Sequence, residues 1–201
     1  LPISISANAD FKAAAPVIEG LGIKSPYYTS FEGLNVSGKW SIALRGIPTQ
    51  LDGKLRQFGT LIAKAKVAEE MGAAGILFIK AKNPKVAAEL IPPSISVGPR
   101  EVTLPALNLT DESASRLLSN GAPDFDLLAL FRSYLNSERT VGFPLKARIS
   151  GVVRLTPVQT TGRNVIASLI VGDEPSAEAV MLGGHIDHIG FGNRGGTLAK
   201  G

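Results

Sequence analysis

The strongest candidates for chemistry in this sequence are two histidines and an aspartate near its C-terminal end. Residues 183–188 read Gly-Gly-His-Ile-Asp-His, which places His185, Asp187 and His188 within one short stretch. A neutral imidazole is a common zinc ligand, and a neighbouring carboxylate can fix its tautomer and raise its basicity. The three residues are therefore candidates for a zinc site. The alternative is that they form only hydrogen bonds within a loop.

The number of available ligands limits what this stretch could do by itself. A catalytic zinc ion needs three protein ligands, and successive residues of one extended segment cannot all converge on one ion. The sequence contains no cysteine and no histidine besides His185 and His188. Either the other ligands are carboxylates from elsewhere or residues beyond Gly201, or there is no metal.

Composition and charge exclude several other classes of protein. The chain has 201 residues, of which 44% are hydrophobic and 19% charged, as in ordinary globular domains. No apolar run approaches the roughly 20 residues of a membrane-spanning helix, so we expect no membrane partner. The net charge is only +4 and the basic residues are scattered. Even the pair Lys64 and Lys66 lacks neighbouring aromatic residues, which favours a solvated face over a nucleic-acid surface.

The middle of the sequence predicts a strand, a helix and a second strand in succession. Residues 40–44 and 76–79 are apolar runs of strand length, and the second is typical of a strand covered on both faces. Residues 60–71 have an apolar stripe at helical spacing, and Gly72 stands where a helix often ends. We expect a βαβ unit whose helix turns its charged residues to solvent. The charged residues of this helix are Lys64, Lys66, Glu69 and Glu70.

Further elements are predicted on the C-terminal side of this unit. A short strand is expected over 104–109, then a helix capped by Thr110 and a second helix from Pro123 to about residue 135. Residues 143–155 alternate between apolar and polar, and Gly151 interrupts the pattern as a bulge would. The fold class is therefore mixed α/β.

A domain boundary is expected between residues 157 and 162, giving domains over 1–160 and 161–201. Apolar runs over 164–171 and 179–182 predict two strands in the second part. A piece of about 40 residues with two strands cannot bury a core of its own, so we expect it to pack on other protein.

The first part resembles the protease-associated (PA) domain. In that family a strand ends in Arg-Gly, and a helix with Lys and Ala four residues apart leads through Gly-Ala to a buried strand. The later Leu-Pro-Ala at 104–106 and the helix after Thr110 fit the family's closing strand and helix. The resemblance implies a PA-type β-sandwich or open barrel with flanking helices. The matching positions are Gly38, Lys39, Leu44, Arg45, Gly46, Lys64, Ala68, Gly72, Ala73, Gly75 and Ile76.

The second part is similar to the first strands of the catalytic domain of di-zinc aminopeptidases, whose relatives include glutamate carboxypeptidase and the transferrin receptor. The similarity lies in residues 161–167, Thr-Gly-Arg-Asn-Val-Ile-Ala, and 180–190, Val-Met-Leu-Gly-Gly-His-Ile-Asp-His-Ile-Gly. By this resemblance His185 is a zinc ligand, Asp187 is the carboxylate that orients it, and His188 has no ligand role. The family's other ligands and its general base would come after Gly201.

Together the two resemblances imply a fragment of a zinc-dependent aminopeptidase that hydrolyses peptide bonds at substrate N-termini. The intact parent would hold two zinc ions and act on peptides or proteins, whereas this chain alone would be inactive. The PA part would modulate substrate access or bind a partner, and the family's habit indicates a secreted or periplasmic protein. The alternative is a stand-alone module that binds proteins or peptides without catalysis.

Overall fold

The computed structural model describes residues 1–47, 52–80, 90–91, 102–124, 142–156, 161, 163–170, 172 and 180–184. The chain divides into two units, Leu1–Pro157 and Val158–Gly201. The helices and strands below all belong to the first unit.

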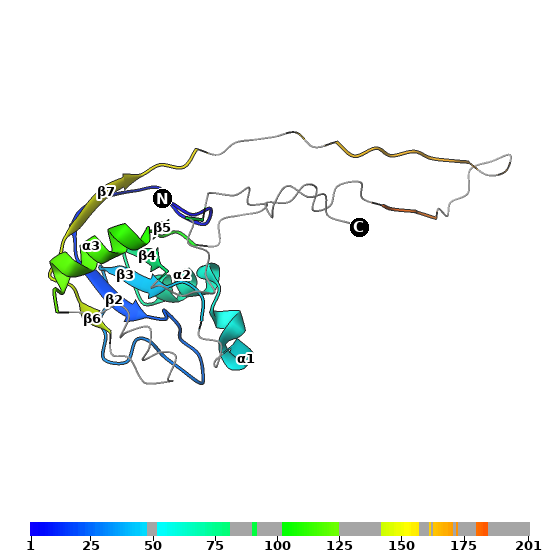
Figure 1. Ribbon diagram of the computed structural model, residues 1–201. Helices are drawn as coiled ribbons and strands as arrows, with labels where there is room; N and C mark the ends of the chain where they lie inside the picture. Colours follow the sequence, from blue (N-terminus) through cyan, green and yellow to red (C-terminus); the bar gives the residue numbers. More distant parts are fainter. Residues whose placement is uncertain are drawn as a thin grey trace. The chain divides into compact units, whose positions relative to one another are not determined.

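A five-stranded sheet forms the centre of the first unit (Figure 1). Its strand order is β5-β4-β3-β2-β6, in which the first four strands are parallel to their neighbours and β6 is antiparallel to β2. This mixed sheet with helices confirms the predicted α/β class. The strands are β2 (Pro16–Gly20), β3 (Trp40–Leu44), β4 (Gly75–Ile79), β5 (Ala106–Asn108) and β6 (Phe143–Pro144).

Two helices cover opposite faces of this sheet, α2 (Leu61–Glu70) and α3 (Asp111–Gly121). Alternate residues of β4 divide between them, because successive side chains of a strand point to opposite faces. Leu77 shares a buried cluster with Leu118 of α3, whereas Phe78 shares one with Ala65 of α2. Both faces of the central strands are therefore buried. A short α1 (Asp52–Leu55) and a 3-10 turn, η2 (Arg56–Phe58), precede α2.

The predicted strand, helix and strand in the middle of the chain are confirmed. β3 and β4 are parallel neighbours, and α2 connects them. The helix begins after Thr60, whose side-chain oxygen accepts a hydrogen bond from the backbone N–H of Ala63. It ends before Gly72, whose positive φ of 78° favours glycine. Local capping residues thus set both ends of the helix.

The next predicted elements also form where the structure describes them. β5 is shorter than the expected strand over 104–109, and α3 begins after Thr110, which accepts a hydrogen bond from Ser113 N at 3.1 Å. Asp111 and Glu112 occupy its first turn, where negative charge favours the helix dipole. The helix predicted from Pro123 to about residue 135 lies almost entirely outside the described residues, which stop at residue 124 and resume at 142.

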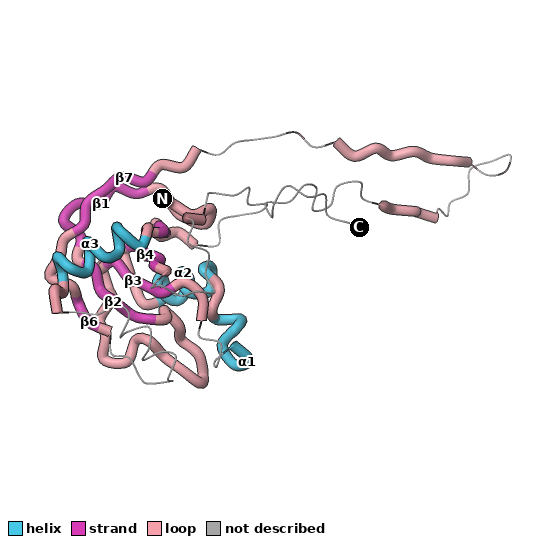
Figure 2. Tube along the Cα trace, viewed as in Figure 1, coloured by secondary structure: helices cyan, strands magenta, loops and turns pink. Residues whose placement is uncertain are grey.

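A separate two-stranded sheet joins β1 (Ala9–Ala14) to β7 (Ile149–Val153), antiparallel (Figure 2). The expected bulge is present at this site, but the extra residue lies on β1. Phe11 pairs with Gly151 and Ala14 with Ile149, so β1 has one residue more between the two pairs. Gly151 is required here because a Cβ would lie 2.8 Å from the ring of Phe11.

Packing against the sheet is tight around Trp40. Its ring is buried, with its centroid 4.2 Å from that of Phe11, and Trp40 is the register partner of Gly75 across β3 and β4. A Cβ on Gly75 would lie 2.7 Å from the indole ring. Only glycine therefore leaves room for the indole at this point of β4.

We expect Gly75→Ala to lower the free energy of unfolding by about 1–3 kcal/mol, because the new methyl group overlaps a buried, tightly held ring. Equilibrium unfolding in urea measures the change. The control is Gly53→Ala in α1, whose Cβ meets nothing within 4 Å and which we expect to be neutral or slightly stabilising. Equal stability of Gly75→Ala and the parent would contradict this account of the packing.

Candidate functional site

The predicted metal-binding residues lie outside the part of the chain that the structure describes. His185, Asp187 and His188 belong to residues 185–201, so their positions are not part of the geometry below. Within the described ranges, no three histidine, aspartate, glutamate or cysteine side chains are grouped as a metal site requires. No helix of those ranges is long and apolar enough to cross a membrane.

The two strands predicted in the second unit do not form within its described residues. Residues 163–170 and 180–184 have no regular secondary structure and are exposed throughout. Val165 and Leu182 are 93% and 94% exposed although both are strongly apolar. A strand needs a hydrogen-bonded neighbour and a covered face, and apolar periodicity supplies neither. The prediction of strands over 164–171 and 179–182 was therefore wrong for the described part of this unit.

A buried polar cluster lies in the layer between the sheet and α2, and the sequence analysis missed it. Its members are Glu19 on β2, Ser41 on β3 and Lys64 on α2, each with 0% of its surface exposed. Lys64 was expected on the solvated face of the helix, and that expectation was wrong. Its long side chain instead crosses beneath the helix to the end of β3.

Lys64 is held by two backbone oxygens. Its Nζ donates to the carbonyl of Leu44 at 2.6 Å and to that of Gly46 at 2.7 Å. These carbonyls flank Arg45, where the chain leaves β3, and Gly46 has a positive φ of 74°. The amino group thus satisfies two acceptors that the end of the strand leaves without a sheet partner. This polar role explains why a lysine occupies an inward position of the helix.

Glu19 is placed by an irregularity of the sheet. Ile18 pairs with Ile42 and Gly20 with Ala43, so Glu19 is an extra residue on β2, and such bulges re-aim side chains. Its Oε2 accepts a hydrogen bond from Ser41 Oγ at 2.8 Å. No partner for its Oε1 is found among the described residues. Gly22 leaves the space for this carboxyl, since a Cβ there would lie 2.8 Å from Oε1.

Burial shifts the ionisation of both buried groups toward neutrality. Loss of solvation raises the pKa of Glu19 from 4.5 to about 7, against the opposing hydrogen bond from Ser41 and the charge of Lys64. Loss of solvation lowers the pKa of Lys64 from 10.5 to about 7, against the charge of Glu19. Two groups that are normally fully charged therefore both titrate near neutral pH inside the domain.

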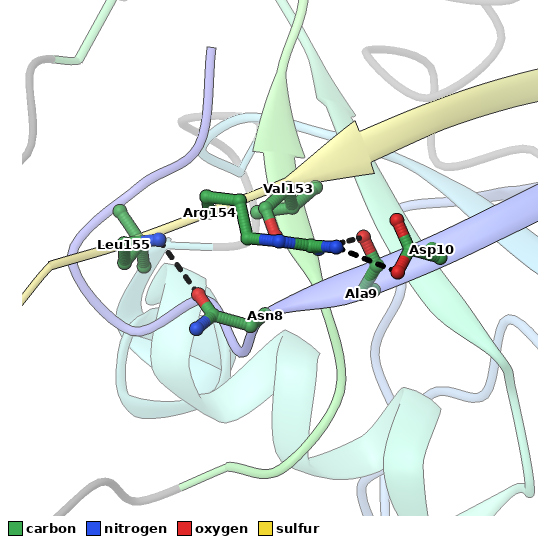
Figure 3. Close-up of polar contacts among 6 residues, drawn as sticks. All are labelled: Asn8, Ala9, Asp10, Val153, Arg154 and Leu155. Carbon is green, nitrogen blue, oxygen red and sulfur yellow. Dashed lines mark hydrogen bonds and ion pairs between the residues drawn. The ribbon is translucent and has the colours of Figure 1, made fainter.

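The chain leaves β7 through a second, exposed polar cluster (Figure 3). Arg154 forms an ion pair with Asp10 at 2.6 Å and donates to the carbonyl of Ala9 at 3.2 Å. One residue further, the backbone N–H of Leu155 donates to Oδ1 of Asn8 at 2.6 Å. These contacts extend the pairing of β1 with β7 beyond Val153, toward the boundary of the first unit.

Comparison with known proteins assigns no family to the chain. No protein-family model matches the sequence, and no curated protein matches it significantly.

The opposite pKa shifts of Glu19 and Lys64 have opposite effects on stability. Glu19 binds its proton more tightly in the folded state, so its contribution is present below pH 4.5 and is lost as the pH rises to about 7. Lys64 binds its proton less tightly in the folded state, so its contribution is present above pH 10.5 and is lost as the pH falls to about 7. The pair therefore contributes least near pH 7.

We expect Glu19→Gln to remove the loss of stability between pH 4.5 and 7, and Lys64→Met to remove the gain between pH 7 and 10.5. Urea unfolding across this pH range measures both slopes. The matched controls are Glu70→Gln and Lys66→Met, which change exposed groups on α2, the helix that carries Lys64. Both controls should leave the slopes of stability against pH unchanged. Parallel pH profiles for Glu19→Gln and the parent would disprove the assignment.

We expect Arg154→Ala to lower the free energy of unfolding by less than about 1 kcal/mol, because both partners of its ion pair are largely exposed. Amide hydrogen exchange should nevertheless become faster at the end of β7. The control is Arg148→Ala, which lies before β7 and outside the cluster. A loss of more than about 2 kcal/mol would show that the cluster is a global rather than a local support.

Proposed function

We propose that this chain combines a PA-type domain with the beginning of the catalytic domain of a zinc-dependent aminopeptidase. One observation carries the proposal: the motifs of both domains occur in a single sequence, in the order those enzymes have. The reaction would be hydrolysis of the N-terminal peptide bond of a peptide or protein. The protein would act outside the cytoplasm, as secreted or periplasmic members of such families do.

The positions of the PA-like motif residues support the first half of this proposal. Arg45 and Gly46 form the turn at the end of β3, and Lys64 binds the carbonyls of that turn from α2. Ala68 is fully buried against the sheet, where a larger residue would push the helix away. The residues that carry the resemblance thus have roles that a helix packed on this sheet requires.

In the second half of the proposal, His185 would bind zinc and Asp187 would accept a hydrogen bond from its imidazole. Zinc bound there would serve as a Lewis acid toward the scissile carbonyl and lower the pKa of a bound water molecule. By the same resemblance, the other ligands and the general base of the site would follow Gly201. The task of this chain's own acid, Asp187, would be to fix the imidazole tautomer and strengthen the bond to the metal.

We expect the product of the complete natural reading frame to cleave aminoacyl-4-nitroanilides in a zinc-dependent manner. Asp187→Asn should lower metal affinity or activity about 10–100-fold, and His185→Ala should lower them further. His188→Ala is the matched control and should remain close to the parent. Activity and bound zinc are measured on each purified variant.

Two outcomes would contradict the proposal. An active His185→Ala variant with its full zinc content would remove this residue from the metal site. A complete protein that binds peptides without cleaving them, with or without zinc, would establish the alternative of a binding module.

A further inference from the structure

The turn after β3 is closed by a single side chain from another layer of the fold. Lys64 Nζ donates to the carbonyls of Leu44 and Gly46, one on each side of Arg45. The backbone N–H of Arg45 donates to the carbonyl of Ile79 at 2.7 Å, so the turn is also tied to β4. Residues 44–46 are therefore held both by β4 and by the contact from α2, and only the contact from α2 comes from a group that can gain or lose a proton.

The strength of this contact depends on the protonation of the amino group. An ammonium group has three N–H donors and a neutral amine has two, so either state can donate to both carbonyls. Hydrogen bonds from a charged donor are roughly twice as strong as those between neutral groups. Loss of the proton would therefore weaken the hold on the turn without abolishing it.

Glu19 is the charged group that acts on Lys64 from the sheet. Its carboxyl lies in the same layer, its Oε1 has no partner among the described residues, and its charge favours the protonated amine. The other elements packed on this layer present different groups. β4 is apolar, and Ser41 of β3 does not ionise in this range. On α2 itself Lys66 and Glu70 are exposed, and Glu69 is bonded to Thr103. Arg45 is acted on by Asp111 of α3, and Arg56 on η2 is exposed.

We propose that Glu19 and Lys64 form a proton-operated latch, in which loss of the Lys64 proton loosens the turn at Leu44, Arg45 and Gly46 under α2. The proposal rests on the two carbonyl contacts, the complete burial of both groups and the bulge that directs Glu19 into the same layer. It does not depend on zinc or on peptidase activity.

The latch should operate near neutral pH, because burial brings the pKa of Lys64 to about 7. As the pH rises above about 7 the turn should loosen, while the domain as a whole becomes more stable because the buried charge of Lys64 is removed. The turn should thus lose local stability while the free energy of global unfolding increases. In ordinary unfolding the two would change in the same direction, so this difference separates the latch from unfolding.

Nuclear magnetic resonance on the full chain tests the latch directly. We expect the 15Nζ signal of Lys64 and the carbonyl 13C signals of Leu44 and Gly46 to titrate together, with one midpoint near pH 7. Glu19→Gln should move this midpoint down by about half a pH unit or more, because the carboxylate that favours the ammonium is gone. Above the midpoint, the backbone amide of Arg45 should be less protected from hydrogen exchange than the free energy of global unfolding predicts.

The matched control is Glu70→Gln, which removes an exposed carboxylate from the same helix and should leave the midpoint in place. Lys64 remaining an ammonium group up to pH 9, or carbonyl signals that do not follow its titration, would overturn the proposal. Because these signals are recorded on the folded parent protein, the test stands even if a variant fails to fold.

Discussion

The α2 side of the domain depends on one buried amino group that binds two carbonyls. Lys64 connects the helix to the end of β3, where Leu44 and Gly46 would otherwise have unpaired oxygens inside the protein. Burying a charge is costly unless it is well bonded, and here the contacts to the strand end and the carboxyl of Glu19 offset part of the cost, so that the pKa of Lys64 is still lowered. Small residues such as Ala65 and Ala68 bring the helix close enough for this reach.

The parts of the fold with local signals could be predicted from the sequence. Thr60 and Gly72 mark the ends of α2, because helix capping depends only on residues adjacent in the sequence. The uninterrupted apolar run of β4 predicts a strand that is buried on both faces. Lys64 could not be placed, because helical periodicity treats every lysine as solvent-facing and takes no account of strand ends. The available signal was that Lys64 lies next to Ala65 and one helical turn before Ala68, and so stands at the edge of the apolar stripe.

Predictions that depend on distant partners were less successful. β1 was not expected, since its pairing with β7 joins residues about 140 positions apart and is visible only in the folded chain. Residues 163–170 have the apolar pattern of a strand but no neighbour among the described residues. The candidate zinc site likewise depends on residues from distant segments of the chain. His185 and Asp187 indicate a type of ligand, whereas a metal site exists only where several segments converge.

The antiparallel β1 and β7 bring the first strand of the unit beside the last one. Before β1 the chain runs along β5, where the backbone N–H of Ile3 donates to the carbonyl of Ala106 and that of Asn108 donates to the carbonyl of Leu1. The end of the β1–β7 ribbon is held by Arg154 on Asp10 and by Leu155 on Asn8. Residues 1–7 therefore cover the outer edge of β5, and their removal would leave that edge of the sheet without a partner in the described part of the chain while the β1–β7 ribbon kept its own hydrogen bonds.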